Sequence, residues 1–207
     1  MRFVVLPLAM LTSSAAAAEP VDCDAIENRM APVELTYHDA DNLSVTQVYR
    51  DQSGNSVVWI KTLNGKFVAK GVFVAGILAT GETTSAYAGK FKSSKITYTV
   101  EGMPRLFDRR SDLKYSIAHS TVYEDGSTDE SSTTYNYKFK SAGKERVGPC
   151  MLDVVRGETD TVNEKTGKAS HTYGVYFPQL MTGMTGKTAE PVLDDIKTKF
   201  DPMTPIP

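Results

Sequence analysis

The feature that most constrains the fold of this chain is a hairpin signal in residues 56–79. There the dipeptide Asn64-Gly65 separates two runs that are rich in valine, isoleucine and phenylalanine. Asparagine and glycine accept the positive φ angles of a type I′ turn, whose twist matches that of two paired strands. The pattern therefore predicts an antiparallel hairpin with a two-residue loop, around which the rest of the sheet is built.

The two-residue loop also predicts the pairing of this hairpin, with Ile60 opposite Ala69 and Trp59 opposite Lys70. One face of the hairpin then carries no charge, and we expect it to pack on the core. The other face includes Trp59, mixes lysines with apolar residues and should meet water in part. The uncharged face consists of Val58, Ile60, Thr62, Phe67, Ala69, Gly71 and Phe73.

A second hairpin signal lies in residues 112–140, where Gly126 ends the turn. A two-residue loop would leave each face half apolar, whereas a three-residue loop places Tyr115 opposite Tyr135 and gathers the apolar residues on one face. Because a slip of one residue turns a whole face over, burial selects the three-residue loop. The apolar face then consists of Leu113, Tyr115, Ile117, Tyr123, Tyr135, Tyr137 and Phe139.

Weaker patterns complete the secondary structure. Alternating apolar residues predict strands at 33–37, 43–50 and 95–100, and a third hairpin that joins 151–161 to 169–177. A short helix is predicted at 22–31, where Asp24 and Glu27 have the spacing of a capping box. Small or polar residues predict loops at 80–89, 102–110 and 179–189. Residues 192–200 fit a helical stripe and a weak strand equally well.

The N-terminus has the pattern of a secretory signal peptide. Arg2 precedes an apolar stretch, and the small residues Ala16-Ala17-Ala18 supply a cleavage site. We therefore expect removal of residues 1–18, a single β-rich domain over 19–200, and a flexible, proline-rich tail over 201–207. The expected location of the mature protein is the periplasm or the extracellular space.

The two cysteines, Cys23 and Cys150, are predicted to form one disulfide. An exported chain meets an oxidising compartment, where an even pair of cysteines is usually bridged. The alternative is a redox or nucleophilic thiol, but the chain contains no C-x-x-C motif and neither cysteine has a histidine nearby in sequence.

Charge and motifs exclude several classes of function. The chain has 23 basic and 25 acidic side chains, a balance that favours neither nucleic acid nor an anionic membrane as partner. Gly186-Lys187-Thr188 resembles the end of a P-loop, but Met181 stands where that motif requires glycine. Signatures of serine hydrolases and zinc enzymes are also missing. The sequence therefore predicts no reaction, no cofactor and no metal site.

Histidines and aromatic residues on strands are the candidate ligand-binding residues. His119 has the same parity as Tyr115 on its strand, and His171 has the same parity as Tyr173. If those two faces meet, both histidines would line one pocket as polar anchors in a mostly apolar cavity. The ordinary alternative, which we favour for the histidines, is that each is a hydrogen-bonded core or rim residue. Trp59 completes the candidate set.

Successive hairpins with one polar and one apolar face predict an all-β domain. We expect a strongly twisted antiparallel sheet of about eight to ten strands, curled into a barrel or half-barrel with a short N-terminal helix, and a β-sandwich is the alternative. The expected function is exported binding of a hydrophobic or amphipathic small molecule or lipid. The alternative is an envelope module that interacts with proteins and has no catalytic activity.

Overall fold

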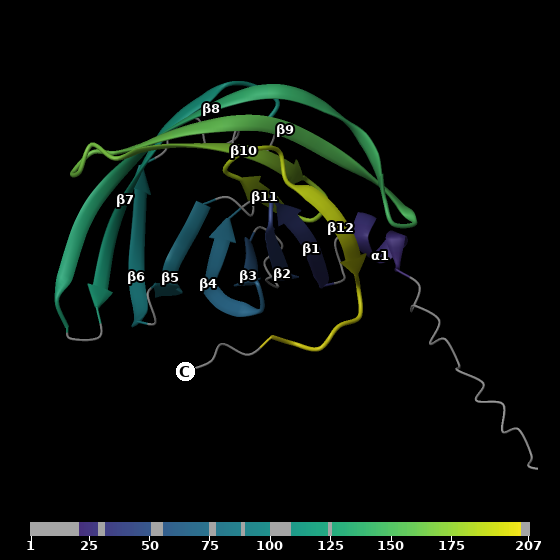
Figure 1. Cartoon of the computed structure of the whole chain (residues 1–207), viewed down its shortest axis with the longest axis horizontal. Coiled ribbons are helices and arrows are strands. Elements are labelled where there is room, and N and C mark those ends of the chain that lie inside the picture. Colours follow the sequence, from purple (N-terminus) through teal and green to yellow (C-terminus); the bar gives the residue numbers. More distant parts are fainter. Residues whose placement is uncertain are drawn as a thin grey trace, which may run out of the picture.

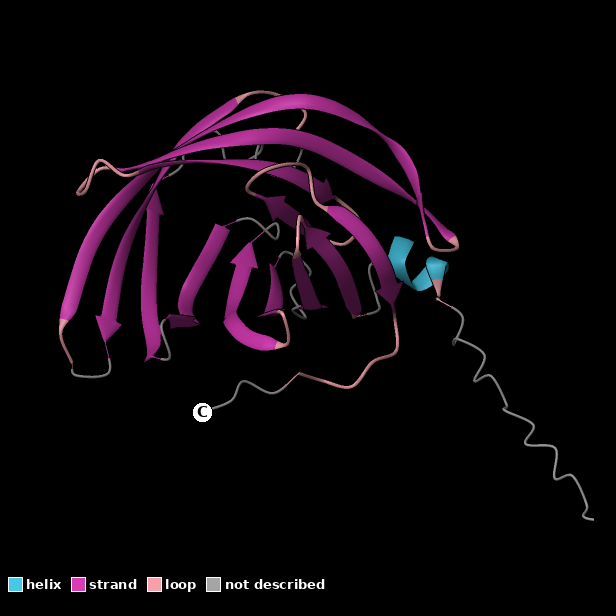
Figure 2. Cartoon of the chain, in the orientation of Figure 1, coloured by secondary structure: helices cyan, strands magenta, loops and turns pink. Residues whose placement is uncertain are grey.

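A computed structural model describes residues 21–28, 32–50, 56–74, 78–87, 90–99, 109–123 and 126–203. The expected signal peptide over 1–18 lies outside these residues, as does most of the expected connection over 102–110. The described part contains one short helix and twelve strands, which confirms an all-β fold (Figure 2).

The strands form one antiparallel ladder in the order β11-β10-β9-β8-β7-β6-β5-β4-β3-β2-β1-β12. Each strand pairs with its neighbour in sequence, except that β12 returns to pair with β1. Their bounds are β1 Val33–Asp39, β2 Asn42–Arg50, β3 Ser56–Leu63, β4 Lys66–Val74, β5 Leu78–Tyr87, β6 Lys90–Thr99, β7 Leu113–Tyr123, β8 Thr128–Val147, β9 Cys150–Asn163, β10 Ala169–Phe177, β11 Thr182–Gly186 and β12 Val192–Lys197.

The ladder curls, but it does not close into a barrel among the described strands. The long strands β8 and β9 arch over the shorter strands β1 to β5 (Figure 1), while β11 and β12 stand at the two ends of the strand order. The two ends of the ladder face each other across a shared core, so the sandwich expected as an alternative describes the arrangement as well.

The core joins the first strands of the ladder to the last. It brings α1, β1, β2 and β3 together with β9, β10, β11 and β12, and it excludes water from all but a few per cent of each side chain. Its most buried members are Ile26, Leu35, Val57, Leu152, Val154, Phe177, Met184 and Ile196.

Two segments differ from the sequence prediction, and in a third the structure decides between two alternatives. β5 occupies most of the expected loop over 80–89, because its threonines are β-branched and fit a pleated strand without apolar alternation. β11 lies inside the expected loop over 179–189, where Gly183 allows close approach: a Cβ there would lie 2.9 Å from the carbonyl oxygen of Val175. The ambiguous segment 192–200 contains strand β12.

The first hairpin has the predicted turn but not the predicted pairing. Leu63 lies opposite Lys66, as a two-residue loop requires, and a bulge then shifts the ladder by one residue. Trp59 consequently pairs with Gly71, and the expected pairing of Trp59 with Lys70 is wrong, as is that of Ile60 with Ala69.

The bulge also decides which face meets the core. It brings Phe73 of β4 to the same face as Val57 and Trp59 of β3, and this face packs on the core, whereas we expected the face of Ile60 to do so. Ile60 is buried on the opposite face. The assignment of the two faces from alternation alone was therefore wrong for β3.

The second hairpin is confirmed in register. Tyr115 pairs with Tyr135 and Leu113 pairs with Tyr137, as the three-residue loop predicts, and Gly126 has a φ of 78°. β9 and β10 form the third hairpin.

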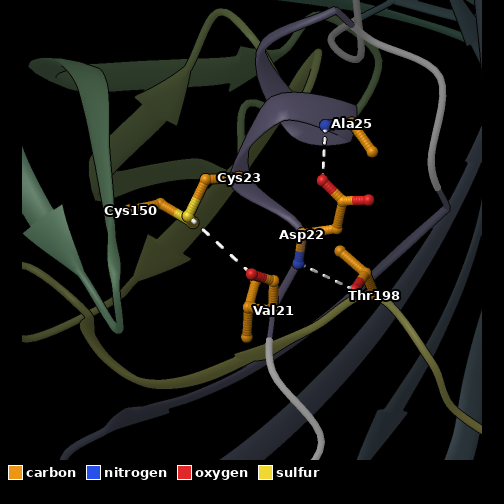
Figure 3. Close-up of a disulfide and its surroundings, with 6 residues drawn as sticks. All are labelled: Val21, Asp22, Cys23, Ala25, Cys150 and Thr198. Carbon is orange, nitrogen blue, oxygen red and sulfur yellow. Dashed lines mark hydrogen bonds between the residues drawn. A yellow bond between two sulfur atoms is a disulfide. The ribbon is translucent and has the colours of Figure 1, made fainter.

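The helix α1 (Cys23–Glu27) is shorter than predicted and is held by the disulfide (Figure 3). Its N-cap is Asp22, whose side chain accepts a hydrogen bond from the amide of Ala25, so the predicted capping box that starts at Asp24 was wrong. The predicted bridge between Cys23 and Cys150 is confirmed and ties α1 to the first residue of β9, with 5.4 Å between the two Cα atoms.

Candidate functional site

An aromatic cleft lies between the core-facing side of β1 to β4 and the edge strand β11. Its volume is about 350 Å³, which lies within the range of roughly 300–1,000 Å³ that is usual for small-molecule sites. We call it the Trp59 cleft. It is lined by Tyr37, Thr46, Trp59, Lys61, Val68, Phe73, Thr182, Gly183 and Thr185.

The bulge in the first hairpin builds the apolar wall of this cleft. Because Trp59 lies opposite Gly71, which has no side chain, its indole reaches diagonally across β4 and stacks on Phe73. The two ring centroids are 4.6 Å apart and the ring planes differ by 23°. Val68, the extra residue of the bulge, also lines the cleft. Bulges commonly re-aim side chains beside functional sites.

The polar groups of the cleft lie next to the aromatic wall. Thr46 and Lys61 are direct cross-strand partners on β2 and β3. The ammonium group of Lys61 lies 5.2 Å from the centroid of the Tyr37 ring, which makes a cation–π contact. Thr46 is only 5% exposed, and its hydroxyl oxygen has no hydrogen-bond partner. The lining described above contains one cationic residue and no acidic residue.

The candidate residues from the sequence do not form one site. Tyr115 pairs with Tyr135, which pairs with Thr161, whereas His171 pairs with Asp160, the preceding residue of β9. Adjacent residues of a strand point to opposite faces, so Tyr115 and His171 lie on opposite faces of the sheet. Of the candidate set, the structure places Trp59 alone in the Trp59 cleft.

The two histidines are also far apart in the ladder. His119 pairs with Ser131 on β8, and both β8 and β9 separate its strand from that of His171. The His171 ring is exposed: its Nδ1 lies 2.7 Å from an Asp160 carboxylate oxygen, and its edge meets the ring of Tyr173. His171 lies on the same face of β10 as the buried Phe177. It is exposed because burial along β10 increases only toward the Phe177 end of the strand.

A second aromatic cluster surrounds Arg109 on the face of Tyr115. The Arg109 guanidinium lies 4.6 Å from the centroid of the Tyr137 ring and 5.5 Å from that of Tyr176. Gly157 makes room for this packing, since a Cβ there would lie 2.2 Å from the Tyr137 ring. We therefore interpret this cluster as a packed structural core in which Arg109 makes cation–π contacts with two tyrosine rings.

The stability of the protein at alkaline pH should depend on Tyr135, which belongs to this second cluster. Burial, and then the neighbouring Tyr115, raise the pKa of Tyr135 from 10.0 to about 12. Between these two pH values the unfolded chain loses the phenolic proton while the folded chain keeps it, so stability is expected to fall as pH rises through this window. Urea unfolding across the window checks this. A Tyr135→Phe variant should show a shallower fall, and an unchanged slope would contradict the assignment.

Among the described residues, no cluster of three or more histidine, cysteine, aspartate or glutamate side chains is arranged to hold a metal ion. No helix in the described part is long and apolar enough to cross a membrane.

No family model, curated protein or solved structure matches the chain. The function of the Trp59 cleft therefore has to be inferred from its own chemistry.

Proposed function

We propose that this chain is an exported binding protein for a hydrophobic or amphipathic small molecule, which it holds in the Trp59 cleft. The observation that carries the proposal is the stacked Trp59–Phe73 wall beside a cleft of about 350 Å³. Binding sites for small molecules are typically concave and mostly apolar, with a few polar groups that orient the ligand.

Two further observations support this proposal. The Cys23–Cys150 bridge suits a protein that folds in an oxidising compartment, in agreement with the signal-peptide pattern. The curl of the sheet, which we interpret as an open half-barrel, turns the core face of β1 to β4 toward β11, and these strands form the two sides of the cleft. An interaction module would need no such concave aromatic site, and we rank it second.

Energy transfer from Trp59 tests the proposal directly. Trp59 is the chain's only tryptophan, so its emission reports on the cleft without interference from other indoles. Titration with the neutral apolar probe N-phenylnaphthylamine should quench that emission in a saturable manner, while the emission of the probe rises.

A variant pair locates the probe. Phe73→Ala removes the stacked partner and should weaken probe binding by about tenfold, since an aromatic contact contributes roughly 0.5–1.5 kcal/mol beyond its buried area. Phe139→Ala removes a half-buried phenylalanine of β8 that is not part of the cleft lining and should leave the affinity unchanged. Absence of saturable transfer, or equal weakening by the two substitutions, would contradict the proposal.

A further inference from the structure

We infer that the Trp59 cleft selects a single-chain amphiphile with an anionic head group, which Lys61 and Thr46 bind. The inference rests on the function proposed above and adds the chemical class of the ligand. Its starting point is a cation on the core-facing side of a strand, beside a buried hydroxyl group that has no partner.

Lys61 lacks a counter-charge in the described part of the chain. It lies on the same face as the buried Val57, it is half-buried, and its ammonium group contacts the ring face of Tyr37 and forms no ion pair with any described residue. Ammonium groups are rarely withdrawn from water unless they are paired, because the loss of hydration is costly. A ligand that covers Lys61 must therefore supply a negative charge or leave the ammonium group without compensation.

Thr46 adds a hydrogen-bond donor next to this cation. It is the direct cross-strand neighbour of Lys61, lines the same cleft, and its hydroxyl has no hydrogen-bond partner in the protein. Buried hydroxyl groups are normally hydrogen-bonded. An anionic oxygen placed between the two residues would accept from both the hydroxyl and the ammonium group, and hydrogen bonds to charged groups are the stronger ones.

The remaining lining fits an alkyl chain. Val68 and the stacked rings of Trp59 and Phe73 supply the apolar surface. The cleft volume of about 350 Å³ lies near the lower end of the usual range for ligand sites, which favours one chain over two. The expected order of affinity is therefore anionic, then neutral, then cationic head groups on the same chain.

Displacement of bound N-phenylnaphthylamine tests this order with four amphiphiles that share one alkyl chain. Laurate and lauryl sulfate, each below its micelle concentration, should displace the probe at about tenfold lower concentration than lauryl alcohol. Lauryltrimethylammonium should displace it least well. Comparison of laurate with lauryl sulfate distinguishes recognition of a carboxylate from recognition of negative charge alone. Tighter binding of either anion than of lauryl alcohol supports the inference.

A matched pair of lysine variants identifies the cation responsible. Lys61→Met should weaken laurate by about tenfold to a hundredfold and leave lauryl alcohol nearly unchanged. Lys70→Met removes the same charge from an exposed position of the same hairpin, on its other face, and should change neither affinity. Thermal unfolding of both variants confirms that they are folded.

The outcomes separate the inference from the function on which it rests. If the probe does not bind the parent protein, the proposed function fails. If the probe binds but laurate and lauryl alcohol compete equally, or if both lysine substitutions weaken laurate alike, head-group selection by Lys61 is overturned and the binding function stands.

Discussion

Removal of the Cys23–Cys150 bridge is expected to lower the free energy of unfolding by about 3–5 kcal/mol. The two cysteines are separated by 127 positions, so the bridge closes a long loop in the unfolded chain and removes much of its conformational entropy. The native state also depends on the bridge locally, because α1 has only five residues and buries Ile26 in the core. A helix of that length does not hold itself together in water.

Urea unfolding of a double variant, Cys23→Ala with Cys150→Ala, measures this contribution. Alanine avoids placing a serine hydroxyl at the buried position of Cys150. The parent protein under reducing conditions is the control and should lose a similar amount of stability. Because the Trp59 cleft takes no residue from α1, the folded double variant should still bind the apolar probe. A loss below about 1 kcal/mol would contradict the role assigned to the bridge.

Local signals predicted the hairpins well. Asn64-Gly65 and Gly126 are turns whose backbone angles few other residues accept, and each was found at the predicted position with a positive φ at its glycine. In the second hairpin the apolar residues alternate cleanly, so burial alone distinguishes the correct register from its neighbour. The pairing of Tyr115 with Tyr135 followed from this alternation.

The face of β3 could not be predicted in the same way, because both of its faces are buried. Val57 packs on the core, and Ile60 is buried on the other side. Alternation therefore carries no information there, and the bulge at Val68 shifts the partner strand by one residue. The apolar residues on both faces of this strand were the signal that both faces could be buried.

The Trp59 cleft could not be predicted from local sequence patterns either. Its walls come from β1 to β4 and from β11, which are far apart in sequence and meet only when the ladder curls. The repeated glycines of β11 resemble a loop, yet Gly183 and Gly186 allow the backbone to pass close to β10 and to Asp39. A local pattern predicts which residues form a strand, but not which distant strand it will face.

Gln47→Leu is expected to lower the free energy of unfolding by about 3 kcal/mol or more, because Gln47 attaches the C-terminal segment to the sheet. Its side chain is fully buried, and its amide uses all of its hydrogen-bonding capacity. The amide nitrogen donates to Glu34 and to the carbonyl oxygen of Asp201, each at 2.7 Å. The amide oxygen accepts from the Tyr49 hydroxyl and from the Met203 amide, each at 2.7 Å.

We expected a flexible tail over 201–207, of which 204–207 lie outside the described residues. Asp201 and Met203 each form a hydrogen bond with Gln47 of β2. Phe200 adds an edge-to-face contact with Tyr49, at 5.9 Å between ring centroids. Leucine at position 47 would be of similar size but would break all four hydrogen bonds, at roughly 1–3 kcal/mol for each partner that water cannot then reach.

A double-mutant cycle identifies the origin of the loss. Gln47→Leu is combined with deletion of residues 201–207, and urea unfolding is followed by the fluorescence of Trp59. In the shortened chain two of the four partners of Gln47 are already gone, so the substitution should cost about half as much as in the full chain. Equal costs in the two backgrounds would mean that Gln47 stabilises the sheet through Glu34 and Tyr49 alone. A coupling of about 1 kcal/mol or more would establish that one buried amide holds the end of the chain against β2.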